Sequence, residues 1–75
     1  MKTTRKQLVN FAIGLVKEIS KSNKNISIDC KNTHINIWFY KDNIAERISI
    51  WSHISLRENK QEFRKAILKI RGIVL

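Results

Sequence analysis

The chain has 75 residues, with 15 lysines and arginines against 6 aspartates and glutamates, and its formal charge is +9. This length predicts one small domain, residues 1–75, with a core close to the lower limit of stability. One cysteine excludes an internal disulfide and favours a reducing, cytoplasmic setting, and the short apolar runs predict neither a membrane span nor a signal peptide.

The first element is a predicted helix over about residues 3–21, capped by Thr3 or Thr4. Apolar residues recur at helical spacing and form a stripe that is wider than one buried face needs. We therefore expect one flank to contact a sheet and the other to contact a second helix or a partner. The stripe comprises Leu8, Phe11, Ala12, Leu15 and Ile19, widened by Val9, Ile13 and Val16.

Three strands are predicted next, over about residues 25–30, 34–40 and 44–53. Short turns at 31–33 and 41–43 indicate two consecutive hairpins. One face of the strands is apolar and is predicted to face the core, including Cys30 on the first strand. The opposite face carries polar side chains together with Trp38, Tyr40 and Trp51.

A second helix is predicted over about residues 57–72, with Ser55 as its cap and Glu58 completing a capping box. Its apolar stripe is Phe63, Ala66, Ile67, Ile70 and Val74. Both helices need the same apolar sheet face, so the predicted fold is α+β. It is a two-layer α-β-β-β-α domain, with a three-stranded antiparallel meander and both helices on one face.

Two surfaces are candidates for function. The first is cationic: basic residues on one flank of the last helix and near the first hairpin could follow a phosphate backbone. An alternative is that the lysines reflect an AT-rich genome, since isoleucine, lysine and asparagine abound and proline is absent. The predicted nucleic-acid or nucleoprotein contacts are Lys31, His34, Lys60, Arg64 and Arg71.

The second surface is the open sheet face. Aromatic residues beside a cation can stack on nucleic-acid bases, act as hot spots for a protein partner or a second copy, or stabilise the sheet. All three interpretations remain open. The predicted protein-interaction residues are Trp38, Tyr40, Arg47 and Trp51, with the two tryptophans as cross-strand neighbours.

The element order, size and charge resemble the double-stranded-RNA-binding domain. That family places two helices on one sheet face and contacts RNA through its first helix, the loop between its first two strands and the start of its last helix. By position, His34 corresponds to the loop histidine, and Lys60, Arg64 and Lys65 to the lysine cluster. The glycine-proline before the histidine is missing, and Lys60-Gln61-Glu62 replaces the paired lysines.

The size and codon bias are also similar to those of small phage and mobile-element proteins, including some anti-CRISPR and host-takeover inhibitors. That resemblance implies an inhibitor or adaptor that binds a host or phage protein. No catalytic, cofactor or metal site is predicted, because Cys30, His34 and His53 lack the spacing of a nucleophile pair or a zinc site. We expect a non-enzymatic binding protein.

Overall fold

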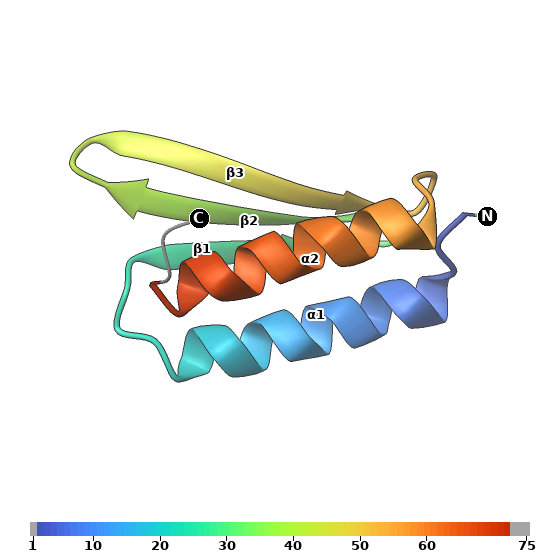
Figure 1. Cartoon of the computed structure of the whole chain (residues 1–75), viewed down its shortest axis with the longest axis horizontal. Helices are drawn as coiled ribbons and strands as arrows, with labels where there is room; N and C mark the ends of the chain where they lie inside the picture. The colour runs from blue at the N-terminus through green and yellow to red at the C-terminus, as the bar shows by residue number, and fades with distance from the viewer. Residues whose placement is uncertain (1, 73–75) are drawn as a thin grey trace.

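The computed structural model describes residues 2–72 and confirms the predicted fold (Figure 1). The elements follow one another as two helices flanking a three-stranded antiparallel meander. The predicted boundaries differ from the observed ones by only one or two residues, and Val74 lies outside the described residues. The elements are α1 (Arg5–Ser20), β1 (Ile26–Cys30), β2 (His34–Lys41), β3 (Ile44–Trp51) and α2 (Leu56–Ile70).

Each helix begins at a hydroxyl cap. Thr4 accepts a hydrogen bond from the backbone N–H of Gln7, and the Gln7 side chain accepts one from the backbone N–H of Thr4, which makes a complete capping box. Ser55 accepts from the backbone N–H of Glu58 at 3.3 Å, as predicted. The reciprocal half of the box is absent among the described contacts, and the Ser55 backbone instead forms an isolated bridge with Lys2.

The meander has a regular register. Trp38 on β2 lies opposite Ser27 on β1 and Arg47 on β3. The β2–β3 turn contains only Asp42 and Asn43, whose φ angles are 51° and 67°. Left-handed conformations at both central residues match the twist of the adjoining strands, and asparagine and aspartate tolerate them best after glycine.

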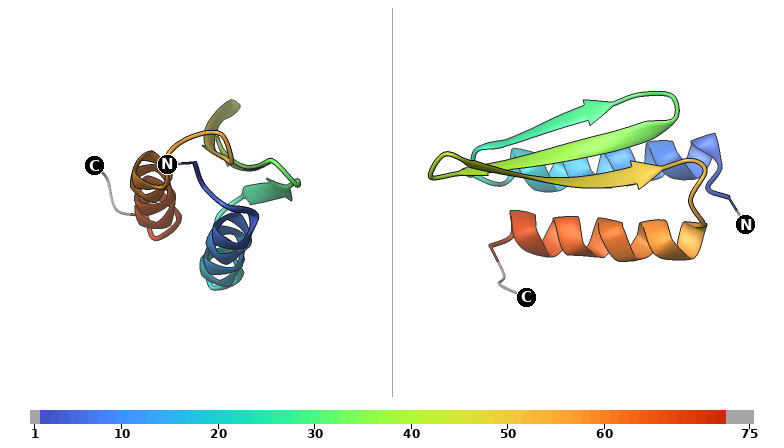
Figure 2. Two further views of the ribbon diagram at one scale, coloured as in Figure 1. Left: turned by 90° about the vertical axis from the view of Figure 1, so that its right-hand side faces the viewer. Right: turned by 90° about the horizontal axis from the view of Figure 1, so that it is seen from above.

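Both helices cover the same face of the sheet and run side by side in the same direction (Figure 2). α2 packs against β3, and α1 packs against β1 and β2. Phe63 of α2 reaches α1, where its ring lies 5.1 Å from the ring of Phe11. A β-carbon added at Gly14 would stand 3.0 Å from the Phe63 ring, so the glycine permits this close approach. The opposite sheet face has no covering element among residues 2–72.

The core lies between the two layers and confirms most of the predicted apolar stripes. Cys30 is an exception: it is exposed, at the end of the edge strand β1. Partial burial of the thiol raises the pKa of Cys30, and the negative charge of the nearby Asp29 raises it further. The buried apolar residues are Leu8, Leu15, Ile35, Ile37, Phe39, Ile50, Ala66 and Ile70.

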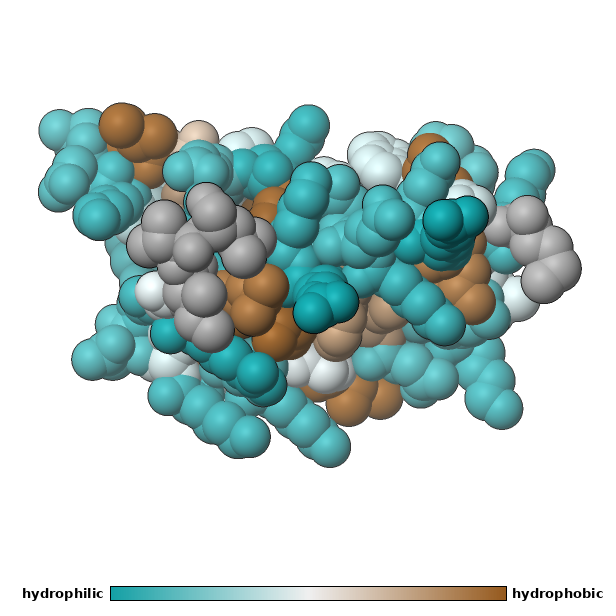
Figure 3. Space-filling view, in the orientation of Figure 1, coloured by the Kyte–Doolittle hydropathy of each residue, from teal (hydrophilic) through white to brown (hydrophobic). Residues whose placement is uncertain are grey.

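The widened stripe of α1 is only partly used. Val9, Ile13 and Val16 are each about half exposed, at 49%, 50% and 48%. Apolar surface interrupts the hydrophilic covering at the lower margin of the molecule, where α1 lies (Figure 3). The other residues of the stripe make the contacts with the sheet and with α2. Val9, Ile13 and Val16 remain about half exposed to solvent.

Candidate functional site

The chain reverses direction at every connection, so its segments meet at two ends of an elongated molecule. The N-terminal segment, the β1–β2 turn and the β3–α2 loop share one end (Figure 1). The α1–β1 connection, the β2–β3 turn and the end of α2 share the other. We call the first the basic end and the second the hairpin end.

A buried asparagine holds the basic end together. Asn59 is 1% exposed and donates to Thr3 Oγ1 at 2.6 Å and to the Trp51 carbonyl at 2.7 Å. Its Oδ1 atom accepts from the Trp51 backbone N–H at 3.3 Å. Thr3, which is 4% exposed, donates in turn to the Ile54 carbonyl. One side chain thus joins the N-terminal segment, the end of β3 and the start of α2.

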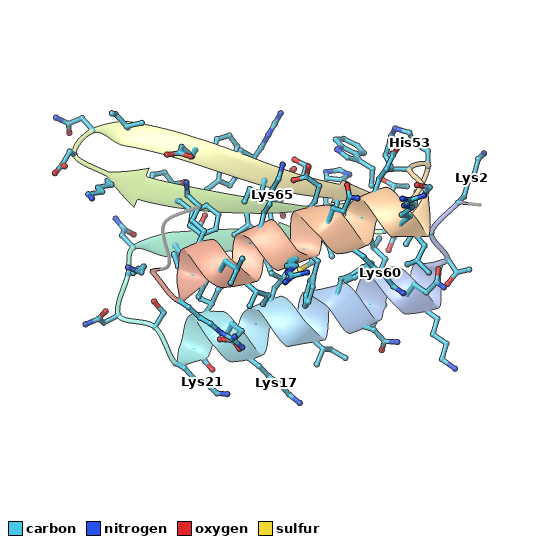
Figure 4. All side chains as sticks on the ribbon, in the orientation of Figure 1. Lys2, Lys17, Lys21, His53, Lys60 and Lys65 are labelled. Atoms are coloured by element: carbon cyan, nitrogen blue, oxygen red, sulfur yellow. The ribbon has the colours of Figure 1, made fainter. Side chains whose placement is uncertain are left out.

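Cations from three separate segments gather at the basic end. The start of α1 is joined to the β1–β2 turn by a hydrogen bond from Arg5 to the Asn32 side chain at 3.3 Å. Lys2, His53 and Lys60 lie at the same end (Figure 4). Both helices also begin here, and a helix N-terminus carries a partial positive charge. Five exposed cations of the basic end are Lys2, Arg5, Lys31, Arg57 and Lys60, and Lys6 follows Arg5 in the first turn of α1.

The ion pairs within residues 2–72 lie elsewhere. Arg71 pairs with Glu18 of α1 at 2.6 Å, Lys69 pairs with Glu46 of β3, and Lys65 pairs with Glu62 at 3.4 Å. The hydrogen bond from Arg71 lowers the pKa of Glu18 and raises that of Arg71. None of the five basic-end cations belongs to an ion pair in this part of the chain, and Glu58 is the acidic residue in the adjoining first turn of α2.

The structure divides the predicted cationic surface. Lys31, His34 and Lys60 come together at the basic end, and Arg64 follows Lys60 one turn along α2. Arg71 lies at the opposite end of α2 and is engaged by Glu18. Helical spacing grouped Arg71 with Lys60 and Arg64 on one flank of α2. Arg71 nevertheless follows the end of α2, far along the helix axis from Lys60.

The aromatic surface is also divided. Trp51 lies opposite His34, whose ring stacks on it at 4.4 Å, and His53 packs against it at 5.4 Å. Trp38 lies under the guanidinium of Arg47, whose central carbon is 5.5 Å from the centre of the ring. The two tryptophans are therefore not cross-strand neighbours, and that prediction was wrong. Tyr40, 43% exposed, continues the open face toward the hairpin end.

Sequence reasoning missed Lys2, Arg5, Arg57 and His53 as members of the basic end. The signal was available, because connections in a simple up-and-down order alternate between the two ends of the fold. The first residues of the chain, the β1–β2 turn and the start of α2 must then meet. Within residues 2–72 no cluster of histidine, cysteine and carboxylate side chains fits a metal ion.

Comparisons with known proteins identify no relative. No protein-family model, curated protein or solved structure matches the chain. No helix in the described part of the chain has both the length and the apolarity to cross a membrane.

Proposed function

We propose that this chain is a non-enzymatic binding protein that holds the phosphate backbone of a nucleic acid, free or in a nucleoprotein, at its basic end. The observation that carries the proposal is the convergence of unpaired cations from distant parts of the chain. Five exposed cations from three segments share one end without ion pairs among the described residues, whereas the three ion pairs lie elsewhere. Cations on rigid elements are what a phosphate backbone requires.

The resemblance to the double-stranded-RNA-binding domain favours duplex RNA as the first ligand to test. The segments through which that family contacts RNA correspond to α1, the β1–β2 turn and the start of α2. All three reach the basic end, with Lys31 and His34 beside the turn and Lys60 on α2. Such binding reads the shape and phosphates of an A-form helix more than its sequence.

Salt-dependent binding tests this proposal. Fluorescence anisotropy with duplex RNA, duplex DNA and single-stranded RNA should show affinity falling as salt rises, with a logarithmic slope of about 0.9 per duplex phosphate neutralised. The triple variant Arg5→Glu, Lys31→Glu, Lys60→Glu should lose most of the affinity and most of the slope. The matched control Lys21→Glu, Lys24→Glu, Lys41→Glu changes the net charge equally at the hairpin end and should bind better than the first variant. Equal losses in both variants would show that only net charge matters.

The open sheet face supports a second candidate function, binding of a host or phage protein as an inhibitor or adaptor. The supporting observation is that Trp38, Arg47 and Tyr40 form a continuous face with no cover among the described residues. Surfaces rich in tryptophan, tyrosine and arginine often carry most of a protein interface's binding energy. The variant Trp38→Ala, Tyr40→Ala should keep its thermal unfolding temperature yet lose a specific partner in affinity capture. Retention of every partner would count against this function.

A further inference from the structure

The two edges of the sheet are treated differently. At the β3 edge, the backbone N–H and carbonyl of Trp51 both bond to the Asn59 side chain, which takes the place of a neighbouring strand. This protection is confined to one end of the edge, because α2 packs on the covered face of β3 and the outward backbone groups of Ala45, Arg47 and Ser49 have no hydrogen bond outside the β2–β3 ladder among the described residues. Natural proteins usually protect a sheet edge by such covering, or by charges, proline or a bulge, since an unpaired edge is a template for another strand.

The β1 edge has no comparable protection. The backbone bonds between Asn25 and Tyr40 and between Lys31 and His34 identify the hydrogen-bonded pairs, which alternate along an antiparallel ladder. Ser27 and Asp29 consequently direct their backbone groups toward β2. The groups of Ile26, Ile28 and Cys30 point outward, and within residues 2–72 no hydrogen bond outside the β1–β2 ladder engages them.

An apolar surface lies beside that edge. Gly14 approaches Phe63 and Glu18 bonds to Arg71, so this flank of α1 faces α2. Val9, Ile13 and Val16 lie on the opposite flank by helical spacing, and α1 is the helix that packs under β1. The unpaired edge and the half-exposed stripe therefore adjoin one another.

We propose that the β1 edge and the α1 stripe bind an extended segment of a partner protein, which adds a fourth strand beside β1. Backbone bonds to Ile26, Ile28 and Cys30 would supply affinity, and alternate apolar side chains would cover the stripe. This surface shares Lys31 with the basic end, but it uses the backbone of β1 and the α1 stripe, so the inference does not depend on nucleic-acid binding.

Charge selects the kind of segment. Lys6 and Lys17 lie one helical turn from members of the stripe, and Lys24 and Lys31 stand on either side of β1 in the chain, although the Lys24 ammonium extends to Gly72 at the end of α2. None of these four belongs to an ion pair within residues 2–72. A second copy would bring the same lysines, Lys6, Lys17 and Lys31 among them, to the same border. The complementary occupant is a segment with acidic residues at both ends of an apolar, alternating centre.

A synthetic peptide with alternating valine and threonine between glutamate ends tests the proposal on the full chain. Amide NMR should show saturable shifts, and hydrogen exchange should show new protection at Ile26, Ile28 and Cys30. In an antiparallel complex the valine amides of the peptide face β1 and the threonine amides face away. N-methylation of the valine amides should weaken binding by about tenfold or more, whereas N-methylation of the threonine amides should be tolerated. A peptide with lysine ends should also bind more weakly.

Variants of the chain provide the second arm. Ile13→Lys should weaken peptide binding, whereas Asn10→Lys adds the same charge outside the stripe and should have less effect. Ile28→Pro removes one outward N–H and should block the edge; its fold is checked by the shifts of α2. The proposal is overturned if the peptide binds without protecting β1 or does not bind at all. It is also overturned if light scattering shows a dimer that Ile28→Pro dissociates, which would assign the edge to a second copy.

Discussion

The two ends of this small domain use positive charge in different ways. At the hairpin end, Arg71 is paired with Glu18 and Lys69 with Glu46, although Lys21, Lys24 and Lys41 form no ion pair among the described residues. At the basic end, the cations have no such partners among the described residues, and the local organisation comes from the neutral side chain of Asn59. A net charge of +9 is thus less informative than the location of its few counter-charges.

The location of the cations bears on whether the lysines reflect only an AT-rich genome. Lysines added by mutational drift should be scattered irrespective of topology. Here Lys2, Arg5, Lys31, Arg57 and Lys60 are distant in sequence, yet the fold brings them to one end. The two ends can therefore be perturbed separately by substitution.

Asn59→Ala should disrupt the basic end most strongly. It removes the side chain that satisfies both backbone groups of Trp51 and the hydroxyl of Thr3, so buried polar groups lose their partners. We expect a loss of about 2–3 kcal/mol in the free energy of unfolding, measured by urea denaturation. Lys60→Ala, on the exposed side of the same helix, is the control and should change stability little. Equal stabilities of the two variants would contradict the role given to Asn59.

Asn43→Val should destabilise the hairpin end while leaving the basic end intact. Asn43 has a φ of 67°, and a β-branched residue in that region costs roughly 1–2 kcal/mol. Asn43→Gly is the matched control, because glycine adopts this conformation readily. Denaturation should separate the two variants, and both should bind duplex RNA with the affinity of the parent chain. If Asn43→Val also lost affinity for duplex RNA, the hairpin end would contribute to binding, which would contradict a site confined to the basic end.

Glu18→Gln should have a small effect that depends on pH. The Arg71 hydrogen bond lowers the folded-state pKa of Glu18, so the carboxylate's contribution to stability is present above the ordinary glutamate pKa. It is lost as pH falls through the lowered value. The stability gap between the parent chain and Glu18→Gln should therefore close in acid, as thermal unfolding at several pH values would show. A gap that stays constant or widens in acid would be inconsistent with this pair.

Much of the fold could be predicted because its local signals agree. Thr4 and Ser55 begin the helices, Asp42 and Asn43 form the turn, and alternating isoleucines define the covered sheet face. Each of these signals acts over a few residues. The element order then leaves few arrangements that bury both helical stripes on one sheet.

The candidate site was predicted less completely, because it depends on relations between elements. Helical spacing put Arg71 with Lys60 and Arg64, but only the packing of α1 against α2 brings Glu18 to Arg71. Strand alternation put Trp38 and Trp51 on one face, but the register places His34 opposite Trp51. Strand alternation puts Cys30 on the core-facing side of β1 with Ile26 and Ile28, but it is exposed because it ends an edge strand.

Amide NMR during titration with duplex RNA tests the central claim most directly, because it reports where the ligand lies. We predict saturable, salt-sensitive shifts at Lys2, Arg5, the 31–34 turn, Arg57 and Lys60, with little change at Asp42, Asn43 and Glu46. Shifts concentrated on Trp38, Tyr40 and Arg47, or spread evenly over every lysine of the chain, would contradict a nucleic-acid site at the basic end.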